Sequence, residues 1–142
     1  MENYLEELSL DGKKIFMKVL AHIARADGNF DDDEKEFVKS LCSINDIDEK
    51  YFDEIIKKRS DDDIAFLVTE ANFSEGLKLA LVRDMFTLAN ADGDLTDNEV
   101  LSIANVGEAL EIPLEKLEEI SEWVADGIDW RLRGQEIFGD FF

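Results

Sequence analysis

Apolar residues recur three and four positions apart along nearly the whole chain, which is the spacing of one face of an α-helix. No stretch shows the sustained alternation of apolar and polar residues that is typical of a half-buried strand. A first helix is expected over residues 10–26, after Ser9, whose hydroxyl can cap it. Its apolar face consists of Ile15, Phe16, Val19, Leu20 and Ile23. The pattern therefore predicts an all-α fold.

Cap residues and breaks divide the rest of the chain into further helices. Asp31 with Glu34, and Thr96 with Glu99, fit the signature in which a cap residue and an acid three places later each accept the other's free amide. The remaining helices are expected over 32–43, from Asp48, over the segment SDDDIAFLVTEA, and over 75–91, 97–110 and 113–126. The result is a compact bundle of about seven to eight helices.

The C-terminal stretch is rich in aromatic residues. Gly127 is expected to end the last long helix, since glycine is a weak helix former. The tail that follows contains Trp130, Phe138, Phe141 and Phe142. We expect this tail to dock on the core, because so many exposed rings would form an apolar patch.

The chain repeats itself at a fixed interval. The phrase Ala-x-Ala-Asp-Gly occurs twice, and its aspartates, Asp27 and Asp92, are 92 minus 27, or 65, residues apart. The same offset pairs Phe16 with Leu81, Leu20 with Met85, Ile23 with Leu88, Phe30 with Leu95, Glu34 with Glu99 and Ile47 with Ile112. A unit of this size is too small to bury its own apolar faces. The repeat predicts one domain over 1–142, built from halves of about 10–71 and 75–139 that pack about a pseudo-twofold axis.

Carboxylates gather in the turn after each copy of the phrase. An Asp near the C-terminal end of a helix faces the negative end of the helix dipole, and a bound cation would reverse that unfavourable interaction. The calcium loop of EF-hands fits only in its second half, because Leu88 and Ile23 stand where its first carboxylate is needed. If the twofold packing brings the turns together, they could share one site for calcium, magnesium or manganese, ions that prefer oxygen ligands. The candidate metal ligands are Asp27, Asp31, Glu34, Asp92, Asp94 and Glu99.

The charge of the chain limits the kinds of binding partner that can be expected. Thirty-five acidic and fifteen basic residues give a formal charge of -20, which repels nucleic-acid phosphate and anionic membranes and favours cations or a basic protein surface. No leader or membrane-spanning pattern is evident, so a soluble, cytoplasmic protein is expected. The one cysteine, Cys42, falls in an apolar pattern and is expected to be a buried structural thiol.

Two segments carry a family resemblance. IARADGNFDDDEKEFVKSL and LANADGDLTDNEVLSIANVGEALEIP resemble the repeated signature of the TerB-like domain family, which is associated with tellurite resistance. The likeness covers residues 10–126. It implies an all-helical fold of about seven helices with internal pseudo-symmetry, a cytoplasmic location, and an acidic metal site at Asp27, Glu34, Asp92 and Glu99.

Three hypotheses about function remain open. The first is a non-enzymatic module of a tellurite or other stress response that holds a divalent cation through the two acidic turns. The second is an acidic interaction scaffold without metal, whose carboxylates only cap helices. The third is metal-assisted hydrolysis, which usually needs histidines or a cationic group for the substrate, whereas the one histidine, His22, is not near either acidic turn.

Overall fold

The computed structural model describes residues 8–26, 30–90 and 95–142 of the chain. In these ranges it contains seven α-helices, two short 3-10 helices (η2 and η3) and no strand, which confirms the all-α prediction. The elements in chain order are α1 (Leu10–Ala24), α2 (Asp32–Ile44), η2 (Glu49–Tyr51), α3 (Phe52–Ile55), α4 (Asp61–Ala71), α5 (Glu75–Ala89), α6 (Asp97–Ala109), α7 (Leu114–Phe138) and η3 (Gly139–Phe141).

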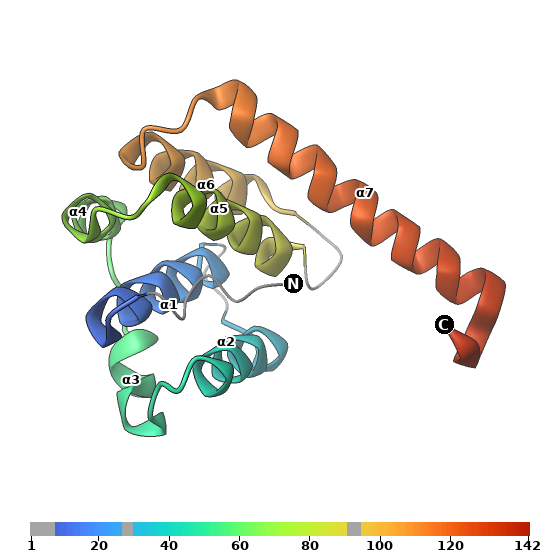
Figure 1. The fold of residues 1–142 in the computed structure, drawn as a ribbon, viewed down its shortest axis with the longest axis horizontal. Helices are drawn as coiled ribbons and strands as arrows, with labels where there is room; N and C mark the ends of the chain where they lie inside the picture. Colours follow the sequence, from blue (N-terminus) through green and yellow to red (C-terminus); the bar gives the residue numbers. More distant parts are fainter. Residues whose placement is uncertain (1–7, 27–29, 91–94) are drawn as a thin grey trace.

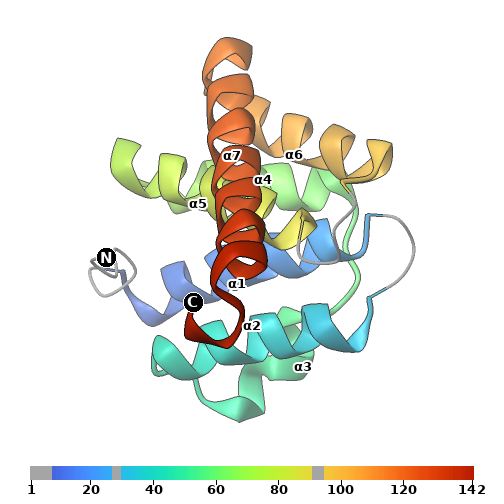
Figure 2. The ribbon, with the colours of Figure 1, turned by 90° about the vertical axis from the view of Figure 1, so that its right-hand side faces the viewer.

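Helix α1 lies at the centre of the molecule. Figures 1 and 2 show it between α2 and α3 on one side and α4, α5 and α6 on the other, and it contacts all five. Its sequence explains this position, because apolar residues occupy most of its circumference. The buried residues of α1 are Phe16, Met17, Val19, Leu20, Ala21, Ile23 and Ala24. A helix that is apolar on most sides is stable only when other elements cover it.

Side-chain caps begin most of the helices where the sequence predicts them. The Ser9 hydroxyl accepts from the Gly12 amide at 3.1 Å, and Ser74 accepts from Leu77 at 3.4 Å. These bonds pair amides that would otherwise lack a partner at a helix N-terminus. Between α4 and α5, Asn72 adopts a left-handed conformation that ends α4, as the break in the pattern predicts.

The lengths of two helix pairs match at the interval found in the sequence. Helices α1 and α5 both have 15 residues and begin at residues 10 and 75, a difference of 65. Helices α2 and α6 both have 13 residues and begin at 32 and 97, again 65 apart. The last parts of the halves differ, since η2, α3 and α4 correspond to the single helix α7. The pseudo-twofold relation between the halves stays a prediction.

Helix α7 corrects the expectation that Gly127 ends a helix. The helix runs unbroken from Leu114 to Phe138, and Gly127 lies in its interior. A glycine inside a helix costs only about 1 kcal/mol relative to alanine, and no proline follows it. Figure 1 shows the last turns of α7 extending beyond the other helices.

The aromatic tail does not dock on the core, so that prediction was wrong. Trp130, Phe138, Phe141 and Phe142 are all exposed. Three of them pack on one another instead: the Phe142 ring lies 5.7 Å from Trp130 and 6.3 Å from Phe138, centroid to centroid. These contacts fold the chain end back onto α7 itself.

The remaining structural expectations concern Cys42 and the membrane. Cys42 is buried, and burial raises the pKa of its thiol to about 11, so it is protonated near neutral pH, as a structural thiol would be. None of the described helices is long and apolar enough to cross a membrane.

Gly107 allows α6 and α7 to approach closely, which gives a test of the packing. A Cβ at Gly107 would lie 2.7 Å from Cδ1 of Leu117, whereas a Cβ at Gly76 on α5 would meet nothing within 4 Å. We expect Gly107→Ala to lower the free energy of unfolding by about 1 to 3 kcal/mol through overpacking. Gly76→Ala, the matched control, should be neutral or slightly stabilising. Urea unfolding of both variants measures this, and equal stabilities would contradict the close packing of α6 on α7.

Candidate functional site

The first acidic turn leads into α2 through a reciprocal cap. The Asp31 carboxylate accepts from the Glu34 amide at 2.8 Å, and Glu34 Oε1 accepts from the Asp31 amide at 3.4 Å. Glu34 is only 5% exposed, which is unusual for a carboxylate. The predicted capping signature is therefore present, and it fixes the side chain of Glu34 at the start of α2.

The second acidic turn leads into α6 in the same way. The Thr96 hydroxyl oxygen accepts from the Glu99 amide at 3.2 Å, and Glu99 Oε1 accepts from the Thr96 amide at 3.0 Å. The Thr96 hydroxyl also lies 2.9 Å from Glu99 Oε1. Glu99 is 2% exposed. Each turn thus holds a buried glutamate at the third residue of the following helix.

The two turns differ in local charge. In the first, the Arg25 guanidinium lies over the Phe30 ring, 4.9 Å from its centroid, and Lys35 lies 5.8 Å from the same ring. At the position 65 residues later than Arg25 stands Asn90, whose amide donates to the Phe86 carbonyl at 2.7 Å. The first turn therefore has a positively charged side chain, Arg25, at the position where the second turn has the neutral Asn90.

The predicted metal ligands are only partly described. Asp31, Glu34 and Glu99 lie at helix N-termini, whereas Asp27, Asp92 and Asp94 fall outside the described residues. In the part of the chain that is described, no three His, Cys, Asp or Glu side chains form a group that could hold a metal ion.

The helix ends that flank both turns lie on one side of the molecule. Figures 1 and 2 agree that the C-terminal ends of α1 and α5 and the N-terminal ends of α2 and α6 share this side. The common side follows from the packing of α5 along α1. It keeps open the hypothesis that the two turns contribute to one site.

A polar cluster between three helices has no counterpart in the sequence analysis. His22 Nε2 on α1 lies 2.6 Å from Asp61 Oδ1 on α4, and Asn105 Nδ2 on α6 donates to Asp61 Oδ2 at 3.2 Å. These partners are 39 and 44 residues apart in the chain, so no local pattern reveals them. The cluster ties α4 to α1 and α6, and it turns the His22 side chain toward α4.

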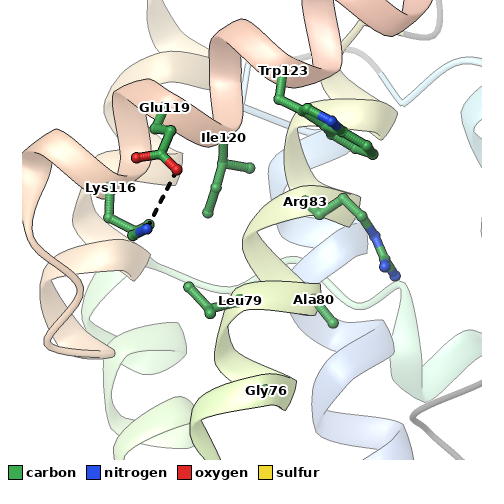
Figure 3. A pocket seen from close by; sticks show the side chains of 8 residues that line it. All are labelled: Gly76, Leu79, Ala80, Arg83, Lys116, Glu119, Ile120 and Trp123. Carbon is green, nitrogen blue, oxygen red and sulfur yellow. Dashed lines mark hydrogen bonds and ion pairs between the residues drawn. The ribbon is translucent and has the colours of Figure 1, made fainter.

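An open groove lies between α5 and α7, and the sequence analysis did not anticipate it either. Its volume is about 450 Å³. Figure 3 shows the side chains that line it. It is lined by Gly76, Leu79, Ala80, Arg83, Lys116, Glu119, Ile120 and Trp123. Lys116 and Glu119 form an ion pair of 3.4 Å at its rim, and Arg83 Nε donates to the neighbouring Asp84 at 2.9 Å.

The fold and the two capped acidic turns define an all-helical, carboxylate-rich domain. A comparison with protein families identifies which one: the family described as "Tellurite resistance protein TerB" matches residues 50–122, half of the chain. The chain belongs to the TerB family, and the predicted resemblance is confirmed. The matched region contains the second acidic turn and begins after the first. No curated protein and no solved structure matches the chain.

The partly buried carboxyl of Asp84, next to Arg83 of the groove, allows the effect of burial on its pKa to be tested. Burial raises the pKa of this carboxyl, and the hydrogen bond from Arg83 only partly opposes the shift. Because the folded-state pKa is above the unfolded-state value, the native state binds the extra proton, so ionisation of Asp84 lowers stability as pH rises through this window. We expect Asp84→Asn to become more stable relative to wild type as the pH rises from about 3 to about 7.

Urea titration at several pH values across that range gives the unfolding free energies of the wild type and of Asp84→Asn. The other carboxylates contribute equally to both proteins, so their contributions cancel in the difference. A difference that is constant with pH would contradict the raised pKa of Asp84.

Proposed function

We propose that this TerB-family chain is a non-enzymatic, cytoplasmic module that binds a divalent cation through its two acidic turns, in tellurite resistance or another stress response. One observation supports this most: each turn holds a buried glutamate, Glu34 in the first turn of α2 or Glu99 in the first turn of α6. Figures 1 and 2 show that these two helix ends lie on the same side of the molecule. Burying a carboxylate is costly unless donors or a positive charge offset the loss of water.

The position of the aspartates adds to the electrostatic argument. In the sequence, Asp27 and Asp92 follow the C-caps of α1 and α5, Arg25 and Asn90, by two residues. Negative charge near a helix C-terminus costs about 0.3 to 1 kcal/mol when exposed. A cation near these carboxylates would remove that cost. Calcium, magnesium or manganese suits an all-oxygen set of ligands.

The two turns should not contribute equally. Arg25 and Lys35 bring positive charge to the first turn through their contacts with Phe30, whereas Asn90 is neutral. A cation approaching the first turn meets more repulsion at short range. We therefore expect the second turn to supply more of the binding free energy.

Calorimetric titration of the metal-free protein tests this proposal. Calcium, magnesium or manganese should bind saturably to the wild type. Asp92→Asn should weaken binding more than Asp27→Asn, and the double variant should abolish it. Asp126→Asn, on α7, makes the same charge change outside the two turns and should weaken binding less than either Asp27→Asn or Asp92→Asn. No saturable binding of any of the three ions, or equal binding by the double variant, contradicts the proposal.

The capping geometry favours a second candidate function, an acidic scaffold that recruits a basic partner. In both turns the glutamate already accepts a backbone amide, so capping alone gives it a role in helix stability. On this view the melting temperature is indifferent to calcium, magnesium, manganese and chelator. Co-purifying protein should elute from the immobilised chain between about 50 and about 500 mM NaCl. A melting temperature that rises with one of these ions favours the metal module instead.

A further inference from the structure

Exposed apolar side chains concentrate on the C-terminal part of the chain. Among the described residues, thirteen large hydrophobic side chains are exposed, and eight of them lie within residues 114–142. Trp123 is 64% exposed, Trp130 71% and Phe141 96%. Single exposed apolar residues are normal on a monomer, but a contiguous patch marks an interaction site. Figure 1 shows that the last turns of α7 lie clear of the other helices, which do not cover them.

We propose that two copies of this chain associate through the C-terminal half of α7, with Trp130 at the centre of a symmetric interface. Three observations carry this proposal: the apolar area, the shape around Trp130 and the distribution of charge. None of them involves the acidic turns, so the proposal is independent of metal binding.

The area is sufficient for a stable dimer. The five aromatic side chains of α7 and the chain end expose on the order of 600 to 700 Å², taking about 200 Å² for a fully exposed ring. A standard protein interface buries about 800 Å² on each partner. Ile137, which is also exposed, lies seven residues after Trp130 and therefore on the same face of α7; it adds on the order of 100 Å² and brings the apolar surface close to that size.

The exposed side chain of Trp130 lies between two hollows of the surface. It forms part of the wall of both hollows, which have volumes of about 360 and 390 Å³. Trp123 and Gly127 line the first, and Gly134 and Phe138 line the second. A ridge between two hollows can insert into the matching hollow of a second copy, which is the arrangement that a twofold interface requires.

The charge distribution favours a second copy over other partners. Residues 127–138 contain two acids, Asp129 and Glu136, and two bases, Arg131 and Arg133; the flanking Asp126 and Asp140 bring residues 126–140 to a charge of -2, in a chain of charge -20. Most other surfaces of two copies would repel each other, because both are negatively charged. An antiparallel pair of these segments can instead place the arginines of one copy opposite the carboxylates of the other. A basic partner would be drawn to the acidic faces instead, and an anionic membrane would be repelled.

Intrinsic tryptophan fluorescence can report on this interface, because both tryptophans of the chain, Trp123 and Trp130, lie on α7. Sedimentation of the full chain from about 1 to about 200 µM should show a monomer–dimer equilibrium. In a Trp123→Phe variant the emission of Trp130 should shift to shorter wavelength as the dimer forms. Raising NaCl from about 50 to about 500 mM should strengthen association, because it screens the repulsion between copies.

Trp130→Ala should weaken association at least tenfold, as expected for a central aromatic residue, and Trp130→Glu should abolish it. Phe66→Glu, a matched change at a side chain that is 65% exposed on α4, should leave association unchanged. Circular dichroism verifies that each variant keeps its helix content.

Three results would overturn the proposal: a wild type that stays monomeric at every concentration, a dimer that Trp130→Glu does not affect, or a Trp130 emission shift that appears only with zwitterionic phosphatidylcholine vesicles. The last result would assign the aromatic patch to a lipid surface.

Discussion

The burial of α1 is the constraint on which the rest of the structure depends. Its apolar residues occupy most of its circumference, so helices from both halves of the chain must cover it: α2, α3 and α4 from the first, α5 and α6 from the second. Neither set would enclose it alone. This requirement also positions the acidic turns, because the C-terminal end of α1 precedes one turn, and that of α5, packed along α1, precedes the other.

An excess of carboxylates is compatible with this core because many of them occupy the first turns of helices. Helix α2 begins with Asp32, Asp33 and Glu34, and α4 begins with three consecutive aspartates. There the free amides and the positive end of the helix dipole stabilise negative charge. The same placement explains how Glu34 and Glu99 can be buried, since each accepts a hydrogen bond from the amide of its own cap residue. Helix capping and a cation site are therefore compatible roles for one residue.

The features that could be predicted from the sequence are those encoded within about one helical turn. Ser9, Asp31 and Thr96 cap helices as expected, because a cap and its amide lie three residues apart. The contact of His22 with Asp61 joins residues 39 apart and depends on how α4 packs, which no local pattern encodes. The paired turns were found through their repeat, but Asp27, Asp92 and Asp94 lie outside the described residues, so the shared cation site stays a prediction.

The exposed half of α7 follows from a local difference between the halves. In the first half, Ser60 and Asp63 form a capping box that starts α4 and sends the chain back across α1 and α6. The positions 65 residues later are Ala125 and Ile128, which cannot form such a box. Without a new helix start, α7 continues through Gly127 and runs past the core. Its last turns then pack mainly against the chain end, η3 and Phe142, and Trp130, Ile137 and Phe138 stay exposed. A surface of this kind is costly in water, and association with another surface is the usual way in which it becomes buried.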